Sequence, residues 1–90
     1  MQKSIMAILS DYGFETRRDG SIWWGTGSLV WGHTAEVKSL GGDLYEVKYH
    51  YWYYDSWGEC LANEDVKTVL YGALLLQYLF ERLPLWRFYR

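Results

Sequence analysis

Residues 44–54 alternate with the period of a β-strand, and this segment constrains the fold more than any other. Every odd position from Tyr45 to Tyr53 carries an aromatic or β-branched side chain, and residues two apart lie on the same face of a strand. The even positions begin with charged residues and end with His50, Trp52 and Tyr54. Because the end of this strand is aromatic on both faces, we expect one face to lie on the core and the other to be covered by a second element or by a partner.

The chain is short but rich in large rings. Its 90 residues are enough for one domain, and a domain of this size buries a smaller share of its surface than a larger one does. Six Trp, nine Tyr and three Phe increase the contact area per ordered residue. We therefore expect a single domain, residues 1–90, with more rings than one small core can hide.

Cysteine content and hydropathy indicate where such a chain would work. A single cysteine, Cys60, cannot form a disulfide within the chain, which is typical of the reducing cytoplasm. The first residues lack a secretory signal, and the longest apolar run, residues 69–80, is interrupted by Gln77 and too short to span a bilayer. These features predict a soluble cytoplasmic protein without a membrane partner.

Charge is distributed unevenly along the chain. Residues 36–65 carry seven acids and two lysines, whereas residues 66–90 carry four basic residues and one acid. Because a nucleic-acid-binding domain is usually basic, the acidic middle disfavours direct nucleic-acid binding. It favours a protein partner with a basic surface, or simple solubility.

The first half of the chain reads as a helix followed by a meander. Apolar residues at helical spacing predict a short helix that ends at Gly13. Strands are expected at residues 21–24, 28–40 and 44–54, joined by loops at residues 25–27 and 41–43. With a three-residue second loop, every facing pair is compatible in charge and burial. These pairs are Lys38 with Glu46, Glu36 with Lys48, Val37 with Val47 and Gly32 with Trp52.

The last third of the chain has helical spacing. Asn63 is a good N-cap, apolar residues recur at helical intervals from Val66 to Phe80, and Pro84 marks the end. The opposite stripe of this predicted helix, Tyr71, Leu75 and Tyr78, is also apolar and suggests self-association as a homodimer. Residues 83–90 are interpreted as a last strand or a docking tail.

These elements predict an α+β fold. It would contain a short N-terminal helix, a three-stranded antiparallel meander and a long C-terminal helix packed on one sheet face.

Catalytic and metal-binding motifs are lacking. The candidate metal ligands are His33, His50 and Cys60, but the predicted register places the two histidines on opposite faces. Cys60 with His50 and Asp55 or Glu59 would be the simplest nucleophilic arrangement, yet these residues lie too close together in sequence for the usual geometry. The loop at residues 25–27 lacks the lysine of a phosphate-binding loop. We therefore predict no enzymatic activity, no catalytic residue, no metal and no cofactor.

The aromatic excess favours a protein-interaction module, since Tyr and Trp are enriched in interface hot spots. The predicted partner-binding residues are three aromatic anchors and three acids: Trp52, Tyr54, Trp57, Asp55, Glu59 and Glu64. Two alternatives remain open. The first helix or the tail could cover this face and make the rings part of the core, or the sheet aromatics could stack on single-stranded nucleic acid.

In its small size, its reducing-compartment chemistry and its lack of motifs, the chain resembles the phage-encoded inhibitors of bacterial immunity known as anti-CRISPR proteins. The resemblance implies a compact inhibitor that acts in the host cytoplasm. It also implies a stoichiometric mode of action, in which the protein covers a surface of a larger protein or ribonucleoprotein complex. No functional residue is carried over from that family.

Overall fold

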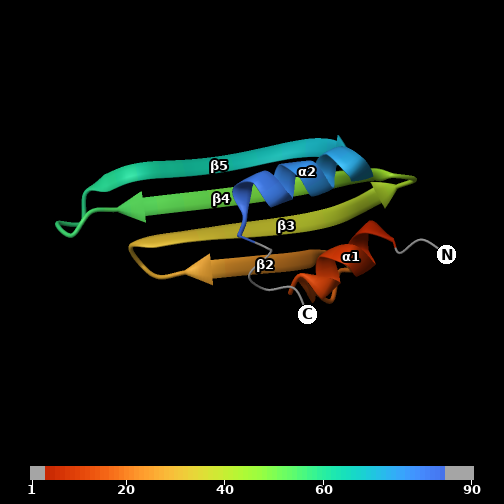
Figure 1. The fold of residues 1–90 in the computed structure, drawn as a ribbon, viewed down its shortest axis with the longest axis horizontal. Coiled ribbons are helices and arrows are strands. Elements are labelled where there is room, and N and C mark those ends of the chain that lie inside the picture. The colour runs from red at the N-terminus through yellow and green to blue at the C-terminus, as the bar shows by residue number, and fades with distance from the viewer. Residues whose placement is uncertain (1–3, 85–90) are drawn as a thin grey trace.

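The computed structural model describes residues 4–84 and shows an antiparallel sheet with two short helices on one face (Figure 1). Five strands follow one another across the sheet in chain order, each antiparallel to the next. The elements in order are α1 (Ile5–Asp11), β1 (Glu15–Thr16), β2 (Ile22–Gly27), β3 (Trp31–Gly41), β4 (Leu44–Tyr54), β5 (Cys60–Tyr71) and α2 (Gly72–Arg82).

The predicted three-stranded meander with a long C-terminal helix is wrong. Residues 60–71 form β5, which pairs with β4 along its whole length, and α2 begins only at Gly72. The spacing of Val66, Val69 and Leu70 matches a helix, but β-branched residues also favour a strand. As a strand, the segment places Val66 opposite Tyr49 and Leu70 opposite Tyr45, and these cross-strand pairs on the core face override the helical spacing.

The N-terminal helix and the central hairpin are predicted more accurately. Ser4 caps α1, since its side chain accepts a hydrogen bond from the Ala7 amide. All four predicted pairs between β3 and β4 are confirmed: Lys38 with Glu46, Glu36 with Lys48, Val37 with Val47 and Gly32 with Trp52. The predicted three-residue loop is not. Gly41 pairs with Leu44, which leaves a two-residue turn and a register shift that absorbs the extra residue as a bulge.

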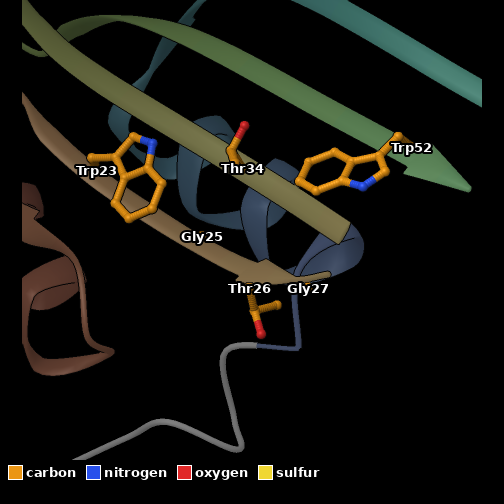
Figure 2. Close-up of a pocket in the computed structure, with 6 residues that line it drawn as sticks. All are labelled: Trp23, Gly25, Thr26, Gly27, Thr34 and Trp52. Atoms are coloured by element: carbon orange, nitrogen blue, oxygen red, sulfur yellow. The ribbon is translucent and has the colours of Figure 1, made fainter. Parts of the chain in front are cut away.

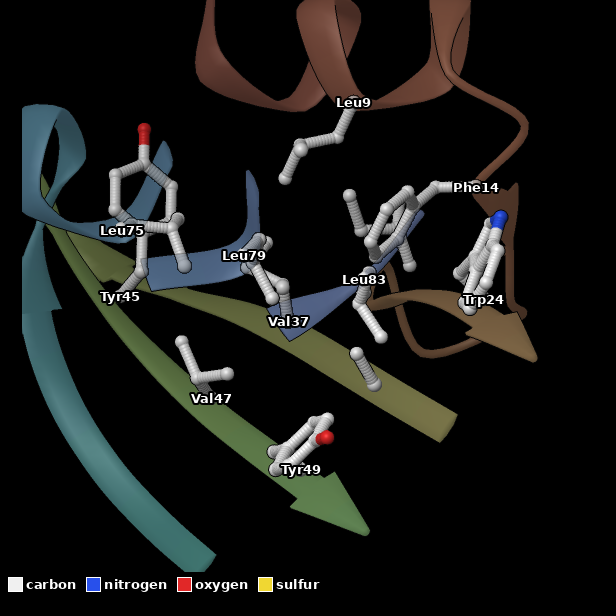
Figure 3. Packing of buried hydrophobic residues seen from close by; sticks show 12 residues of the cluster. Leu9, Phe14, Trp24, Val37, Tyr45, Val47, Tyr49, Leu75, Leu79 and Leu83 are labelled. Atoms are coloured by element: carbon white, nitrogen blue, oxygen red, sulfur yellow. The ribbon is translucent and has the colours of Figure 1, made fainter. Parts of the chain in front are cut away.

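The core lies between the two helices and one face of the sheet (Figure 3). Side chains from α1 and α2 pack there on alternate residues of the three central strands. The buried hydrophobic residues are Leu9, Phe14, Ile22, Trp24, Ala35, Val37, Tyr45, Val47, Tyr49, Leu75, Leu79 and Leu83. We call this side of the sheet the core face and the opposite side the open face.

The two helices cover only part of the core face. In Figure 1 the sheet extends beyond both helices at the end that carries the β2–β3 and β4–β5 loops. Of the helices in residues 4–84, α1 has 7 residues and α2 has 11, and neither is long and apolar enough to cross a membrane. The predicted tail begins at Leu83, which is part of the core. Residues 85–90 of that tail lie outside the described residues.

Candidate functional site

The open face carries a shallow recess bordered by two tryptophans. Trp23 on β2 and Trp52 on β4 lie on either side of β3, with Thr34 between them (Figure 2). The recess has a volume of about 290 Å³ and is lined by Trp23, Gly25, Thr26, Gly27, Thr34 and Trp52. None of the helices in residues 4–84 covers this face, so the recess opens to solvent.

Glycines form the floor of the recess because the indoles lie close to the backbone. A Cβ at Gly25 would lie 2.5 Å from two ring carbons of Trp23, and a Cβ at Gly32 would overlap the ring of Trp52. An aromatic ring that covers a strand glycine shields the exposed backbone beneath it. A side chain at either glycine would therefore displace the ring that lies above it.

Each indole is held by a specific neighbour. Trp52 donates a hydrogen bond from Nε1 to the carbonyl oxygen of Ser28 at 2.9 Å. The guanidinium of Arg17 lies 5.3 Å from the ring centroid of Trp23, within the range of a cation–π contact. The recess is thus built from ordered side chains, which lowers the entropy cost of binding.

Charged side chains around the recess lie in ion pairs. Glu36 lies between Arg17 and Lys48, with N–O distances of 3.8 and 4.0 Å. Further along the face, Lys67 lies 3.8 Å from Glu46. Cations and carboxylates therefore alternate along this part of the face, and the recess is bordered by charges of both signs instead of a field of one sign.

The predicted partner-binding residues do not form one surface. Trp52 and Tyr54 occupy successive even positions of β4 and share the open face. Glu64 pairs with Tyr51, which places it on the core face, on the side of the sheet away from Trp52. The strand that replaces the predicted helix turns this acid away from Trp52.

The remaining predicted residues belong to the β4–β5 loop. Trp57 is 92% exposed at its tip, and Glu59 is also exposed. Asp55 has a structural contact, because its Oδ1 accepts hydrogen bonds from the backbone amides of Trp57 and Glu59, both at 2.9 Å. Its carboxylate therefore shapes the turn.

The predicted self-association stripe does not exist as a surface. Tyr71 is the last residue of β5, whereas Leu75 is fully buried in the core. Tyr78 is half-buried, with its ring edge-on to Tyr49 at a centroid distance of 6.3 Å. A dimer through these three residues would require the core to open.

The two histidines occupy separate environments. On the core face, His33 Nδ1 and the Tyr49 hydroxyl form a hydrogen bond of 3.0 Å. Burial lowers the pKa of His33, and burial together with the nearby Glu64 carboxylate raises the pKa of Tyr49 to about 12. His50 instead bonds to Asn63 through Nε2 at 3.0 Å.

The candidate metal ligands and the cysteine do not come together in a site within residues 4–84. In that part of the chain, no three His, Cys, Asp or Glu side chains gather closely enough to hold a metal ion. Cys60 is exposed at the start of β5, where its thiol donates to the Ala62 carbonyl at 3.7 Å.

Sequence reasoning missed Trp23 as a site residue. Residues 25–27 were expected to form a turn, but they continue β2 and pair with β3 as far as Gly32. The alternation Trp23, Gly25, Gly27 was the available signal, since these three residues share one face of a strand. A glycine-rich strand beside a tryptophan indicates close approach of a ring.

Comparisons with protein-family models, with curated proteins and with solved structures found no match for this chain. Its function is therefore inferred from its surfaces. Among these surfaces, the recess between Trp23 and Trp52 combines anchored rings, an open backbone floor and bordering side chains of both charges.

Proposed function

We propose that the protein is a non-enzymatic binding module whose open face takes an apolar segment of a partner protein, with Trp23 and Trp52 as anchors. The observation that carries this proposal is the glycine-floored recess between the two indoles, on a face that no helix of residues 4–84 covers. Tryptophans dominate binding energy at interfaces because they bury a large area at low entropy cost.

The size of the recess favours a side chain as its occupant. A volume of about 290 Å³ lies at the lower end of the range for small-molecule cavities, and this recess is open to solvent and does not enclose its occupant. Two indoles around an open floor suit a proline ring or an aliphatic side chain on an extended segment, as in aromatic grooves that bind proline-rich peptides. The hydroxyl of Thr34, between the rings, could fix the orientation of such a segment by one hydrogen bond.

The charges around the recess favour an uncharged partner segment. Glu36 is already neutralised by Arg17 and Lys48, so it has little field to attract a basic peptide. Nucleic-acid binding would draw on cations free to replace counterions at phosphates, and these two are engaged with a carboxylate. Shape and apolar contact therefore determine which segment binds, and Asp55 and Glu64 do not act as steering charges in this proposal.

Stoichiometric inhibition of a larger protein or ribonucleoprotein complex stays a prediction from the resemblance to anti-CRISPR proteins. Binding through an open sheet face is compatible with it, since the protein would act by covering a surface of its target. Capture of such a complex by the parent chain would support this part of the proposal.

The test compares tagged variants as baits in a lysate of the source organism, treated with nuclease. Gly25→Ala retains both indoles but places a methyl group against the Trp23 ring, which must move, and Trp23→Ala removes that anchor altogether. Trp57→Ala is the matched control, because it removes an exposed tryptophan from the loop. We expect the parent and Trp57→Ala to retain the same proteins and the other two to lose them. Retention by all four baits, or capture of nucleic acid without protein, would contradict the proposal.

A further inference from the structure

Strand β5 is a long open edge of the sheet. It has 12 residues, pairs with β4 on one side, and has no strand of residues 4–84 on the other. An edge strand of this length presents a row of backbone N–H and C=O groups to which another strand can pair. The opposite edge, β1, has only 2 residues.

The β4–β5 ladder determines which backbone groups face outward. The Gly72 amide donates to the Asp43 carbonyl at 3.0 Å, which makes these residues a hydrogen-bonded pair at the end of the ladder. In an antiparallel ladder such pairs alternate with non-bonded ones. Even residues of β5 therefore direct their backbone groups to β4, and the odd residues Asn63, Asp65, Lys67 and Val69 direct theirs to the open edge.

Charge favours one register for pairing with a second copy, because only an axis through Val66 places Asp65 and Lys67 of the two copies opposite each other. Pairing through outward groups places odd residues opposite odd residues. If the twofold axis passes through Asp65, this residue faces Asp65 of the other copy, and an axis through Lys67 pairs the two lysines in the same way. Like charges directly opposite each other are unfavourable. If the axis passes through Val66, Asp65 faces Lys67 of the other copy on both sides of the axis. Lys67 remains 65% exposed despite its ion pair with Glu46, so it can approach a second carboxylate.

The other pairs in this register are also compatible. Val66, which is 37% exposed, meets its own copy on the core face. Asn63 faces Val69 and Glu64 faces Thr68. At the ends of the ladder, Leu61 lies near Tyr71 of the other copy, and both are more than half exposed in the single chain. Pairing would thus cover apolar side chains that the single chain leaves in water.

The surface beside the edge leaves room for the second copy. A recess of about 280 Å³ lies there, lined by Leu70, Leu74, Gln77, Tyr78, Glu81 and Arg82. Leu70 faces Ala62 of the other copy in this register. The sheet end that extends beyond the helices in one copy would therefore lie beside α2 of the other.

We infer that the protein forms a symmetric dimer by antiparallel pairing of β5 with β5 of a second copy, with Val66 opposite Val66. The pairing joins the two five-stranded sheets into one. Because the axis is perpendicular to the sheet, both open faces point the same way. This interface differs from the predicted helical stripe and requires no core residue to be exposed.

A charge-exchange experiment tests the interface and its register. We measure mass by sedimentation equilibrium over a wide concentration range for the parent, Asp65→Lys, Lys67→Asp and the double variant. The parent should approach twice 10.7 kDa. Each single variant places like charges opposite each other and should weaken the dimer by about tenfold. The double variant should restore it. A parent that stays monomeric, or single variants that dimerise as well as the parent, would overturn the inference.

Hydrogen exchange gives a second readout that depends on no variant. In the dimer, the outward amides of Asp65 and Lys67 should exchange slowly, and dilution to the monomer should release them. The Val66 amide, which bonds to β4, should stay protected in both states. If the protein is dimeric and the Asp65 and Lys67 amides still exchange freely, the copies meet elsewhere and the inference fails.

Discussion

The indole of Trp52 lies directly over Gly32, the residue opposite it on β3. A Cβ at Gly32 would overlap the ring and lie 2.8 Å from the backbone oxygen of Thr26. We expect Gly32→Ala to displace the ring and to destabilise the fold by about 1–3 kcal/mol. Gly25→Ala should cost less, because its methyl group would meet only side-chain atoms of Trp23 and Thr34 and no backbone atom. Urea unfolding compares the two, and equal stability would contradict the close approach of Trp52.

Two adjacent leucines of α2 test the corrected fold. Leu75 is fully buried, whereas Leu74 is 53% exposed. Leu75→Ala should lower the free energy of unfolding by about 2–5 kcal/mol, the cost of a core cavity. Leu74→Ala changes the same atoms in the same helix and should cost less than about 0.5 kcal/mol. Similar losses in urea unfolding would mean that α2 does not face the core as described.

The half-buried His33 predicts how the free energy of unfolding depends on pH. Burial lowers the pKa of His33 from its usual 6.5 in the folded protein, so the unfolded chain takes up the proton more readily. Stability should be complete above about pH 6.5 and should fall as the pH decreases through the lowered pKa. His33→Gln should flatten this part of the stability profile. A stability profile of His33→Gln with the same slope as the parent would contradict this assignment.

Two substitutions of Asp55 distinguish a structural role of its carboxylate from a role in attracting the partner by charge. Its Oδ1 accepts hydrogen bonds from the Trp57 and Glu59 amides in the β4–β5 turn. Asp55→Asn keeps an acceptor oxygen without the charge and should leave stability and association rate near those of the parent. Asp55→Ala should destabilise the protein by about 1 kcal/mol and speed amide exchange in the turn. A slower, salt-sensitive association of Asp55→Asn with the partner would instead show that the charge matters.

The central hairpin was predictable because its information is local. In the pairing of β3 with β4, charged residues face residues of opposite charge and apolar residues share the core face. Only one register satisfies both conditions. Strand β5 was not predictable in this way. Val66, Val69 and Leu70 fit a helical spacing, and the need of β4 for a second neighbour becomes visible only in the complete sheet.

Only the part of the candidate site that lies on β4 could be predicted from a local sequence pattern. Trp52 stood out because β4 alternates clearly. Trp23 did not, because the glycines that allow its ring to lie flat also resemble a turn. Glu64 and Leu75 were assigned to surfaces from the helical reading of residues 63–80. That reading fails at β5, which reverses the face of Glu64 and shifts the start of the helix that carries Leu75.

The most direct test of the binding face is the affinity of the captured partner for three chains, measured by isothermal titration calorimetry. The parent and Trp57→Ala should bind within about twofold of each other, whereas Gly25→Ala should bind at least about tenfold more weakly while remaining folded. If Gly25→Ala binds as tightly as the parent and Trp57→Ala loses affinity, the partner contacts the loop end of the sheet, and the recess between Trp23 and Trp52 is not the binding site.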